Sequence, residues 1–356
     1  MRIRSGRRSA VRAHSSPVSG SQPAWSTIIL GAGPVGLTTA LFAARRGKVL
    51  IVLPSRGDSI QPPRIDSVPV SLLALFIELG LHPAELGVEC VHDTRLTAWE
   101  SHRPVLSRCA ATVHLERPRL ERMLLKLVRL RGGIELRSDV RMNELPHADL
   151  ILDATGRRAV SARERFGGSM PRVCRTFVAR GVFSKRQQVL RLASLPTGYA
   201  YRLGNRTTMT LGLVEDRPLE KGTSCSVLER LGELEAGWLL REFPLVDLKP
   251  GRGGPASVQW TDREGSIIRI GDAAFARDAL ASQGIANGIS NGLRAVKLRD
   301  TRTGALDRQL SEIFSHITRV AEFISTCRHR DSDSWWNYRR ALLNSLRPIT
   351  QMQMFR

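Results

Sequence analysis

The fold is decided by Ser26-Thr-Ile-Ile-Leu-Gly-Ala-Gly-Pro-Val-Gly36, a β-branched run that leads into the motif G-x-G-x-x-G. The segment Leu37–Arg46 that follows is predicted to be a helix, which Gly47 would end. Val49–Leu53 then reads as a buried parallel strand. A strand, a glycine loop, a helix and a second strand within about 30 residues indicate a dinucleotide-binding βαβ unit.

The three motif glycines have separate roles in such a unit. Gly31 permits the tight turn, Gly33 lets the backbone approach a pyrophosphate, and Gly36 lets the helix lie close to the strand. The N-terminus of the helix then offers N–H groups and a positive dipole to phosphate oxygens. The first predicted cofactor-binding residues are therefore Gly31, Ala32, Gly33, Pro34, Val35 and Gly36.

The acid that usually binds the adenosine ribose after the second strand is absent. Pro54 stands in its place, and Ser55, a backbone group or Asp58 could take over its role. We add Ser55 to the predicted cofactor-binding residues. The missing acid is expected to weaken binding by about 1.5–3 kcal/mol, the value of one charge-assisted hydrogen bond.

The composition is that of a globular protein. Of 356 residues, 42% are apolar and 24% are charged, which excludes a disordered chain and suggests about two or three core-sized units. No stretch reaches the roughly 18 consecutive apolar residues of a membrane span.

The chain is strongly basic. Lys and Arg number 54 against 33 Asp and Glu, so the net charge is +21. This charge is either a basic solvated surface or an attraction for an acidic partner, and the lack of basic runs interleaved with aromatic residues argues against nucleic acid.

Residues 1–25 differ from the rest of the chain, because they are rich in arginine and serine and contain no acid. They lack the apolar segment of a secretory signal, so we expect a disordered basic extension or an upstream start codon, with a transit peptide as a minor alternative. The five cysteines are widely spaced and form no C-x-x-C. That pattern argues against a disulfide framework and a metal site, and it favours a reducing, cytoplasmic location.

A second glycine-containing cluster lies towards the other end of the chain. Ser266–Ile270 is predicted to be a strand that runs into Gly271 and Asp272. A loop of small residues follows, and then a helix that contains Gly288 and Gly292. A carboxylate can accept a hydrogen bond from a sugar hydroxyl, and the N–H groups at a helix start can stabilise negative charge.

Together the two clusters resemble the superfamily of FAD-dependent monooxygenases and tryptophan halogenases, which has the fold of the aromatic hydroxylases. The resemblance extends over residues 26–340 and implies FAD as the cofactor. It implies that Asp272, after Gly271, holds the ribityl chain. The chain departs from the family at Ala279, where a proline is usual, and at Phe275, where many hydroxylases have histidine. The loop beside the isoalloxazine ring would be Ser282, Gln283, Gly284 and Ile285.

Shorter matches follow in the order of the family. Val113–Leu124 resembles the strand and helix whose arginine reaches FAD, which gives that role to Arg117. Arg64–Pro69 resembles the segment over the flavin, and Asp149–Arg157 resembles the Asp-Ala-Thr-Gly-Arg motif of the family.

Two further matches point to one branch of the superfamily. Thr97–Ser101 and Trp335–Arg340 resemble segments of the members that modify tryptophan side chains of partner proteins during quinone-cofactor maturation. Trp99 is the candidate ring over the substrate and Glu100 the candidate general base. A plain core role for Trp99 and a solvated strand end for Glu100 are the competing interpretations.

The middle of the chain has a different pattern. The β-rich runs Thr176–Phe183, Val189–Ala193, Gly198–Leu203 and Thr207–Val214 predict an antiparallel sheet over the flavin. The predicted fold class is α/β, with a Rossmann-like FAD-binding domain in discontinuous segments, an inserted antiparallel β-sheet substrate domain and a helical C-terminus. The FAD-binding domain would comprise residues 26–70, 100–170 and 262–300, the substrate domain residues 71–99 and 171–261, and the helical C-terminus residues 301–356.

The resemblance implies an FAD-dependent monooxygenase that hydroxylates an aromatic, tryptophan-like substrate through a flavin C4a-hydroperoxide, with an acidic peptide or protein as a candidate substrate. No second nucleotide loop is present, so NAD(P)H or a separate flavin reductase would supply the electrons. Neither nucleic acid nor a membrane is expected as a partner.

Two alternatives to the monooxygenase are kept. The first is a flavin-dependent halogenase. Against it, the resemblance places the lysine of a halogenase within Thr94–Trp99, no lysine occurs between Lys48 and Lys126, and the Trp-x-Trp-x-x-Pro signature is absent. The second is a degenerate flavoprotein that serves as a binding partner.

Overall fold

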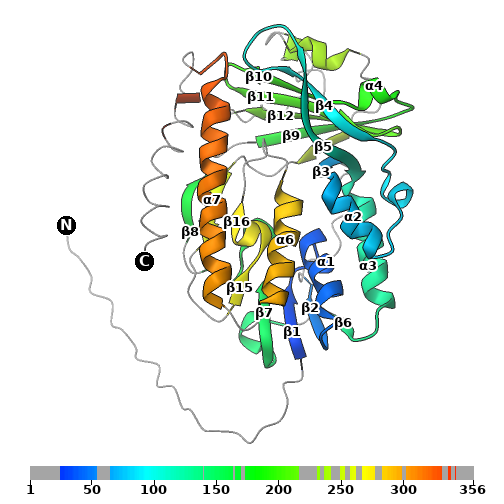
Figure 1. The fold of residues 1–356 in the computed structure, drawn as a ribbon, viewed down its shortest axis with the longest axis vertical. Helices are drawn as coiled ribbons and strands as arrows, with labels where there is room; N and C mark the ends of the chain where they lie inside the picture. The colour runs from blue at the N-terminus through cyan, green and yellow to red at the C-terminus, as the bar shows by residue number, and fades with distance from the viewer. Residues whose placement is uncertain are drawn as a thin grey trace, which may run out of the picture.

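The computed structural model describes residues 25–53, 65–138, 140–162, 165–169, 173–215, 231–232, 236–241, 249–252, 257–261, 267–276, 283–298, 302–330, 336–337 and 341. Within these ranges the strands form three sheets, and helices pack between and beside them (Figure 1). The predicted extension lies outside the described residues except for Trp25, which begins the first strand. Ser55 and Ser282 lie outside them as well.

Sheet A is the parallel sheet that the dinucleotide motif predicted. Its described strands have the order β15-β7-β1-β2-β6, and every neighbouring pair is parallel. β7 therefore lies between the strand of the first glycine loop and the strand of the second. The strands are β1 (Trp25–Leu30), β2 (Val49–Val52), β6 (Ile134–Arg137), β7 (Ala148–Asp153) and β15 (Ile267–Arg269).

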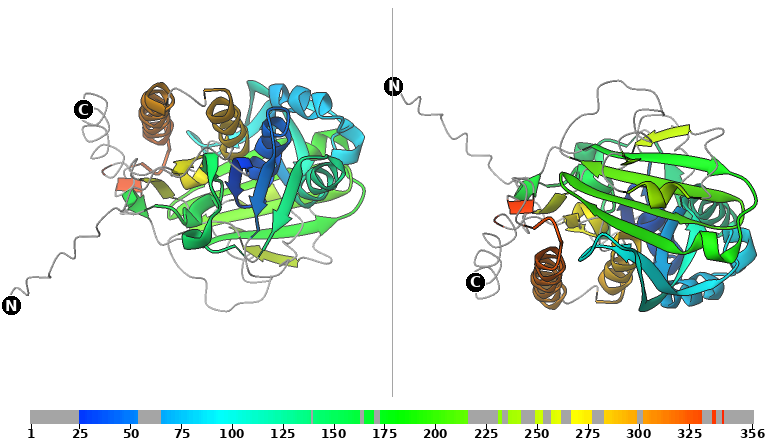
Figure 2. Two further views of the ribbon diagram at one scale, coloured as in Figure 1. Left: turned by 90° about the horizontal axis from the view of Figure 1, so that it is seen from below. Right: turned by 90° about the horizontal axis from the view of Figure 1, so that it is seen from above.

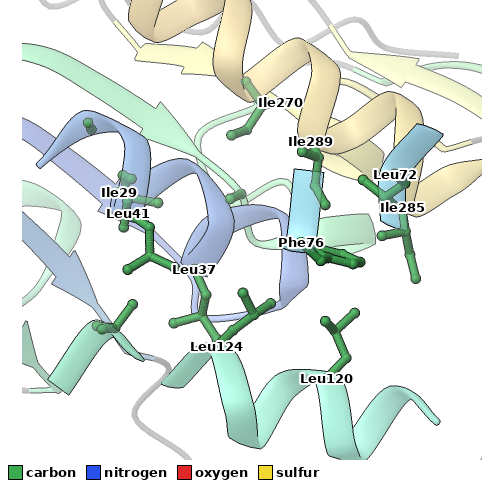
Figure 3. Close-up of a cluster of buried hydrophobic side chains, with 14 of the residues drawn as sticks. Ile29, Leu37, Leu41, Leu72, Phe76, Leu120, Leu124, Ile270, Ile285 and Ile289 are labelled. Atoms are coloured by element: carbon green, nitrogen blue, oxygen red, sulfur yellow. The ribbon is translucent and has the colours of Figure 1, made fainter. Parts of the chain in front are cut away.

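Helices cover one face of sheet A and bury the main core. α3 places Leu120, Leu124 and Val128 at a spacing of four residues, so all three face inward and are buried. Figure 3 shows this core, with Leu37 of α1 and Ile285 of α6 among its labelled side chains. The helices around it are α1 (Pro34–Ala43), α2 (Val70–Glu78), α3 (Arg117–Leu130) and α6 (Gly284–Lys297).

Sheet B spreads over the end of the molecule above these helices (Figures 1 and 2). Its described order is β13-β9-β12-β11-β10-β4-β5-β3, and it is antiparallel except for the pair β4 and β10. The four runs predicted to form an antiparallel sheet, now β9 to β12, do pair antiparallel, and the sheet as a whole is mixed because β4 joins β10 in parallel. Its strands are β3 (Ile65–Pro69), β4 (Val91–Ala98), β5 (Val105–Glu116), β9 (Val173–Arg180), β10 (Leu190–Leu195), β11 (Gly198–Gly204), β12 (Thr208–Glu215) and β13 (Lys249–Arg252).

The two faces of sheet B have separate partners. One face, here the inner face, packs Leu192, Tyr199 and Val214 against the long helix α7 (Arg302–Ser325). The opposite, outer face packs Ala193 and Leu213 against the short helix η4 (Gly237–Leu240). The alternation of side chains along each strand produces this division.

The remaining elements complete the described structure. A small antiparallel sheet contains β8 (Arg165–Ser169), β14 (Ser257–Thr261) and β16 (Phe275–Ala276). The short helices are α4 (Lys185–Gln188), η1 (Pro83–Leu86), η2 (Met142–Glu144), η3 (Gly156–Arg158) and η5 (Gly271–Ala273).

The predicted α/β fold class is confirmed by this architecture. The first βαβ unit, the strand before Gly271 and the β-rich middle all form as predicted, with ends that differ by a few residues. The spacing of Leu228, Leu231, Leu234 and Leu239 predicts a helix over Cys225–Phe243, and most of this segment lies outside the described residues. Among the helices that the structure does describe, none combines the length and the apolar character that crossing a membrane would require.

Candidate functional site

Three loops meet at the carboxyl end of sheet A. β1, β7 and β15 are adjacent and parallel, so the segments that follow them emerge at the same edge. These segments are Gly31–Gly36, Ala154–Arg157 and Gly271–Asp272. Ligands of open α/β sheets bind at this edge, so the topology unites the two glycine clusters that lie far apart in the sequence.

The first loop is a tight turn that only glycine permits at two positions. Gly31 has φ +102°, and a Cβ there would lie 2.8 Å from the carbonyl oxygen of Ala154. A Cβ at Gly36 would lie 2.1 Å from the carbonyl oxygen of Gly31. Both predicted packing roles are visible, since the loop folds against α1 and against the neighbouring segment after β7.

Gly33 differs from its two neighbours, because no atom lies within 4 Å of the position that a Cβ would occupy. Its backbone is extended, with φ −76° and ψ 176°, and it caps α1 without a side-chain hydrogen bond. The first-turn N–H groups of a helix without such a cap are available to an anion. The open space beside Gly33 is therefore a cradle that fits a pyrophosphate.

The second loop lies directly against the first. Gly271 has φ +61°, and a Cβ on it would lie 3.5 Å from Val35 and from Cα of Gly288. α6 begins at Gly284, where a Cβ would lie 3.6 Å from Oδ1 of Asp272. Asp272 thus stands at the N-terminus of α6, and its role as the ribityl ligand stays a prediction.

Asp272 has a charged neighbour from the third loop. Arg157, on η3, lies with its Nε 3.6 Å from Oδ2 of Asp272. The loop that carries Arg157 is fixed by the fully buried Asp153, which accepts hydrogen bonds from Thr155 and Ser161 through both the backbone N–H and the hydroxyl of each. Arg157 therefore reaches Asp272 from a rigid base.

Arg117 approaches the same site from the other side. It begins α3 and its Nε donates to Oδ2 of Asp66 on β3 at 2.6 Å, with Glu121 at 3.8 Å. Burial alone would lower the pKa of Arg117, but Asp66, Glu121 and Asp272 raise it above its ordinary value. The guanidinium is thus permanently charged and oriented beside the second loop, as its predicted contact with FAD requires.

The other predicted cofactor-binding residues have more ordinary surroundings. The side chain of Ile285 is buried in the core, and Ala32 packs against that core. Gln283 precedes α6, and its side-chain oxygen accepts from Asn287 at 3.3 Å. The contribution of these residues to FAD binding stays a prediction.

Trp99 is a buried side chain of the cluster on the inner face of sheet B. Its ring stacks on Phe323 at 4.3 Å and meets Trp336 edge-on at 5.5 Å. Its Nε1 donates to the carbonyl oxygen of Phe323 at 2.8 Å. Glu100 is exposed in the turn after β4. This geometry supports the structural interpretation of Trp99, and the catalytic roles of both residues remain predictions.

Two residues of the site were not among those predicted. Arg157 and Asp66 lie in motifs that the sequence analysis quoted, yet neither was assigned a role. Arg157 follows β7, which lies between the strands of the two glycine loops, and this strand order is seen only in the folded sheet. In the part of the chain that the structure describes, no group of three or more His, Cys, Asp or Glu side chains could hold a metal ion.

Comparison with known families identifies the first part of the chain. Residues 24–165 match the family described as FAD binding domain. A search of curated proteins found no match. The match includes the first glycine loop, Arg117 and Arg157, so the predicted FAD cofactor is confirmed.

Solved structures with the same fold include three flavin enzymes. A peptidyl tryptophan dihydroxylase essential for tryptophylquinone cofactor biogenesis has a TM-score of 0.65 at 21% identity, over 90% of this chain and 79% of that one. The myxobacterial chondrochloren halogenase has a TM-score of 0.65 at 18% identity, over 92% and 90%. The p-nitrophenol 4-monooxygenase of Pseudomonas putida has a TM-score of 0.66 at 17% identity, over 93% and 96%. The fold that the resemblance implied is confirmed, and identities of this size establish a shared fold rather than a shared substrate.

Proposed function

With an FAD-binding domain at residues 24–165, in the fold of flavin monooxygenases and halogenases, we propose that this FAD-dependent enzyme is a monooxygenase for an aromatic substrate. The observation that carries the proposal is the meeting of three loops below the inner face of sheet B. In the overall reaction, one oxygen atom of O₂ replaces a ring hydrogen as hydroxyl. The other oxygen atom leaves as water, and an external donor supplies two electrons that are taken up together with two protons.

Each of the three loops has a separate task in holding FAD. The N-terminus of α1 and the open space at Gly33 receive the pyrophosphate, and Asp272 accepts from the ribityl hydroxyls. Arg157 and Arg117 keep positive charge beside Asp272. When bound, FAD supplies the activation of O₂.

The substrate is proposed to bind between the flavin loops and the inner face of sheet B. Arg95 and Thr97 alternate with outward residues along β4, so both lie on the inner face. Tyr201 of β11 is on the same face and lies over Gly212, where a Cβ would be 2.1 Å from its ring. The half-buried Tyr201 and Arg95 suit an aromatic ring that carries a polar or anionic group.

Halogenation is the second candidate function, because several similar structures are halogenases. The resemblance assigns halogenases a lysine in the stretch Thr94–Trp99, and the basic residue of this chain there is Arg95. Its guanidinium lies 5.8 Å above the ring of Phe323. A guanidinium stays protonated and cannot replace the chemistry of a lysine amine. This favours oxygenation.

A peptide or protein is the proposed form of the substrate. The support is the match of Thr97–Ser101 and Trp335–Arg340 to the tryptophan-modifying branch, together with a net charge of +21 that would attract an acidic partner. One similar structure is a peptidyl tryptophan dihydroxylase.

Cys90, Cys109 and Cys327 are free thiols, which supports the proposed cytoplasmic location.

The experiment combines purified FAD-loaded protein, a flavin reductase, NADH, O₂ and bromide with tryptophan, phenols and tryptophan-containing acidic peptides. Mass spectrometry of the products separates the proposals. Addition of oxygen to an aromatic ring without bromination is the expected result. Bromination above an enzyme-free control would favour the halogenase, and FAD binding without any turnover would favour the degenerate binding partner.

A further inference from the structure

A groove of about 490 Å³ lies on the outer face of sheet B, on the side away from the flavin loops. Its floor is formed by Thr94 and Leu96 of β4 and Leu106 of β5, all of which alternate outward. The flavin loops and α7 are on the inner side, so this groove is separate from the proposed substrate site. Its lining is completed by Pro104, Arg186, Val189, Arg191, Trp238 and Arg241.

The charges that line the groove all have one sign. Arg186 and Arg241 are exposed at its walls, and Arg191 is buried at its floor. No Asp or Glu is among the lining residues that the structure describes. The exposed guanidinium groups of Arg186 and Arg241 can recognise carboxylates or phosphates through paired N–H donors.

The groove is also apolar between these charges. Leu106 has 63% of its surface exposed although it belongs to a strand. Leu96, Val189 and the ring of Trp238 lie around it. The indole Nε1 of Trp238 is buried and has no hydrogen-bond partner in the described part of the chain.

The walls of the groove are held in place by one buried cation. Arg202 of β11 is fully buried and donates to the carbonyl oxygens of Leu239, Arg241 and Gln187. It thereby ties both η4, with Trp238 and Arg241, and α4, with Arg186, to the sheet. The backbone of the groove walls is therefore fixed without a ligand.

The free side of β5 extends this groove. β3 pairs with β5 only over Thr112–Glu116, whereas β4 pairs with it from Val105 onward. Along Val105–Ala111, the edge of β5 that faces away from β4 thus has no strand partner among the described residues. An extended peptide can add to such an edge, and every second side chain would then point to the groove side.

From these observations we infer that the groove binds an extended acidic peptide segment that carries at least one large apolar side chain. Acidic side chains pair with Arg186 and Arg241, and the apolar side chain lies against Leu106 and Trp238. The use of this segment to deliver a substrate rests on the proposed function, whereas the binding itself does not.

The test is fluorescence anisotropy of the FAD-loaded full chain with a labelled peptide of alternating glutamate, leucine and phenylalanine. Two comparison peptides replace glutamate by lysine or the apolar residues by serine. The acidic apolar peptide should bind most tightly. The double variant Arg186→Ala/Arg241→Ala should weaken its binding by about tenfold or more.

A matched control removes the same charge elsewhere. Arg122→Ala/Lys126→Ala lies on exposed residues of α3 and should change the affinity by less than about twofold. Leu106→Glu tests the groove independently of the arginines and should also weaken binding. Retained FAD absorbance shows that each variant is folded. Because no turnover is measured, failure of the monooxygenase proposal would not alter this result.

Three outcomes would overturn the inference. The first is an equal loss of affinity in the α3 control, which would mean that net charge alone attracts the peptide. The second is equal competition by benzoate or by a single-stranded oligonucleotide. The third is binding that Leu106→Glu and the arginine variant both leave unchanged.

Discussion

Gly288 of α6 lies so close to Val35 of α1 that a Cβ on the glycine would stand 2.6 Å from Cγ2 of the valine. The same Cβ would be 3.1 Å from Cα of Gly271. The missing side chain of Gly288 therefore allows α6 to pack closely against both the first and the second glycine loop.

Gly288→Ala is expected to push α6 away from both loops. Overpacking of this kind costs about 1–3 kcal/mol of unfolding free energy, and FAD affinity should fall with it, because the loops no longer meet correctly. Gly132→Ala is the control, since nothing lies within 4 Å of its added Cβ. Urea unfolding of the FAD-free protein and FAD titration measure the two effects. Equal stability of the two variants would contradict the packing argument.

Gly33 and Gly36 should differ sharply although both belong to one motif. Gly33→Val places its side chain in open space, so the FAD-free protein should keep its stability and lose FAD binding. Gly36→Val collides with the carbonyl oxygen of Gly31 and should destabilise the protein itself. Thermal unfolding without FAD and flavin absorbance after addition of FAD distinguish the cases. If Gly33→Val still binds flavin, the pyrophosphate does not bind in the open space beside Gly33.

Arg117→Lys is expected to weaken FAD binding by about tenfold while the fold remains intact. Lysine keeps the charge but cannot hold Asp66 and reach a second acceptor with a planar fork of donors. Arg122→Lys on the exposed side of the same helix is the control. Titration of the unloaded protein with FAD, followed by quenching of flavin fluorescence, gives both affinities. If Arg117→Lys and Arg122→Lys bind FAD with the same affinity, Arg117 pairs with Asp66 but does not contact FAD.

His114 is predicted to make stability depend on pH. Burial, helped by the stacked His92, lowers its pKa from 6.5 to about 3. The unfolded chain thus binds the proton more readily, so the stabilisation is complete above pH 6.5 and is lost as the pH falls towards 3. Between about pH 7.5 and pH 5 the loss should be about 2 kcal/mol.

The check is urea unfolding of His114→Gln at both pH values. Glutamine can still donate to the carbonyl oxygen of Gly204, which accepts from Nδ1 at 2.8 Å, but it does not titrate. Its stability should therefore change less between the two pH values than that of the parent protein. A variant at the exposed His102 should behave as the parent does. If the stability of His114→Gln changes with pH as much as that of the parent protein, groups other than His114 cause the pH dependence.

Much of the fold could be predicted because its signals are local. The glycine loop, the helix with buried Leu37 and the alternating strands each follow from a short stretch of sequence. The parallel pairing of β4 with β10 could not be predicted, because strands of different segments pair through the packing of side chains far apart in the chain. The same reason explains why Trp99 was a candidate for catalysis. Its partners Phe323 and Trp336 lie more than two hundred residues away.

The site was predictable to the extent that its residues follow glycine motifs. Gly31, Gly33, Gly271 and Asp272 are where the motifs place them, whereas the ion pair between Arg157 and Asp272 depends on the order of strands in sheet A. Strand order is a property of the folded sheet and leaves no local mark. The groove on the outer face of sheet B could not be predicted for a similar reason, since its three arginines come from α4, from β10 and from the position after η4.

The most direct test of the central claim is turnover under isotopically labelled dioxygen in ordinary water. The FAD-loaded protein, a flavin reductase and NADH are supplied with an aromatic substrate, either free or within an acidic peptide, and the product is weighed by mass spectrometry. The account predicts that the new ring hydroxyl carries the heavy isotope, since its oxygen derives from O₂. A hydroxyl with the light isotope of water, or bromination of the ring when bromide is present, would contradict it.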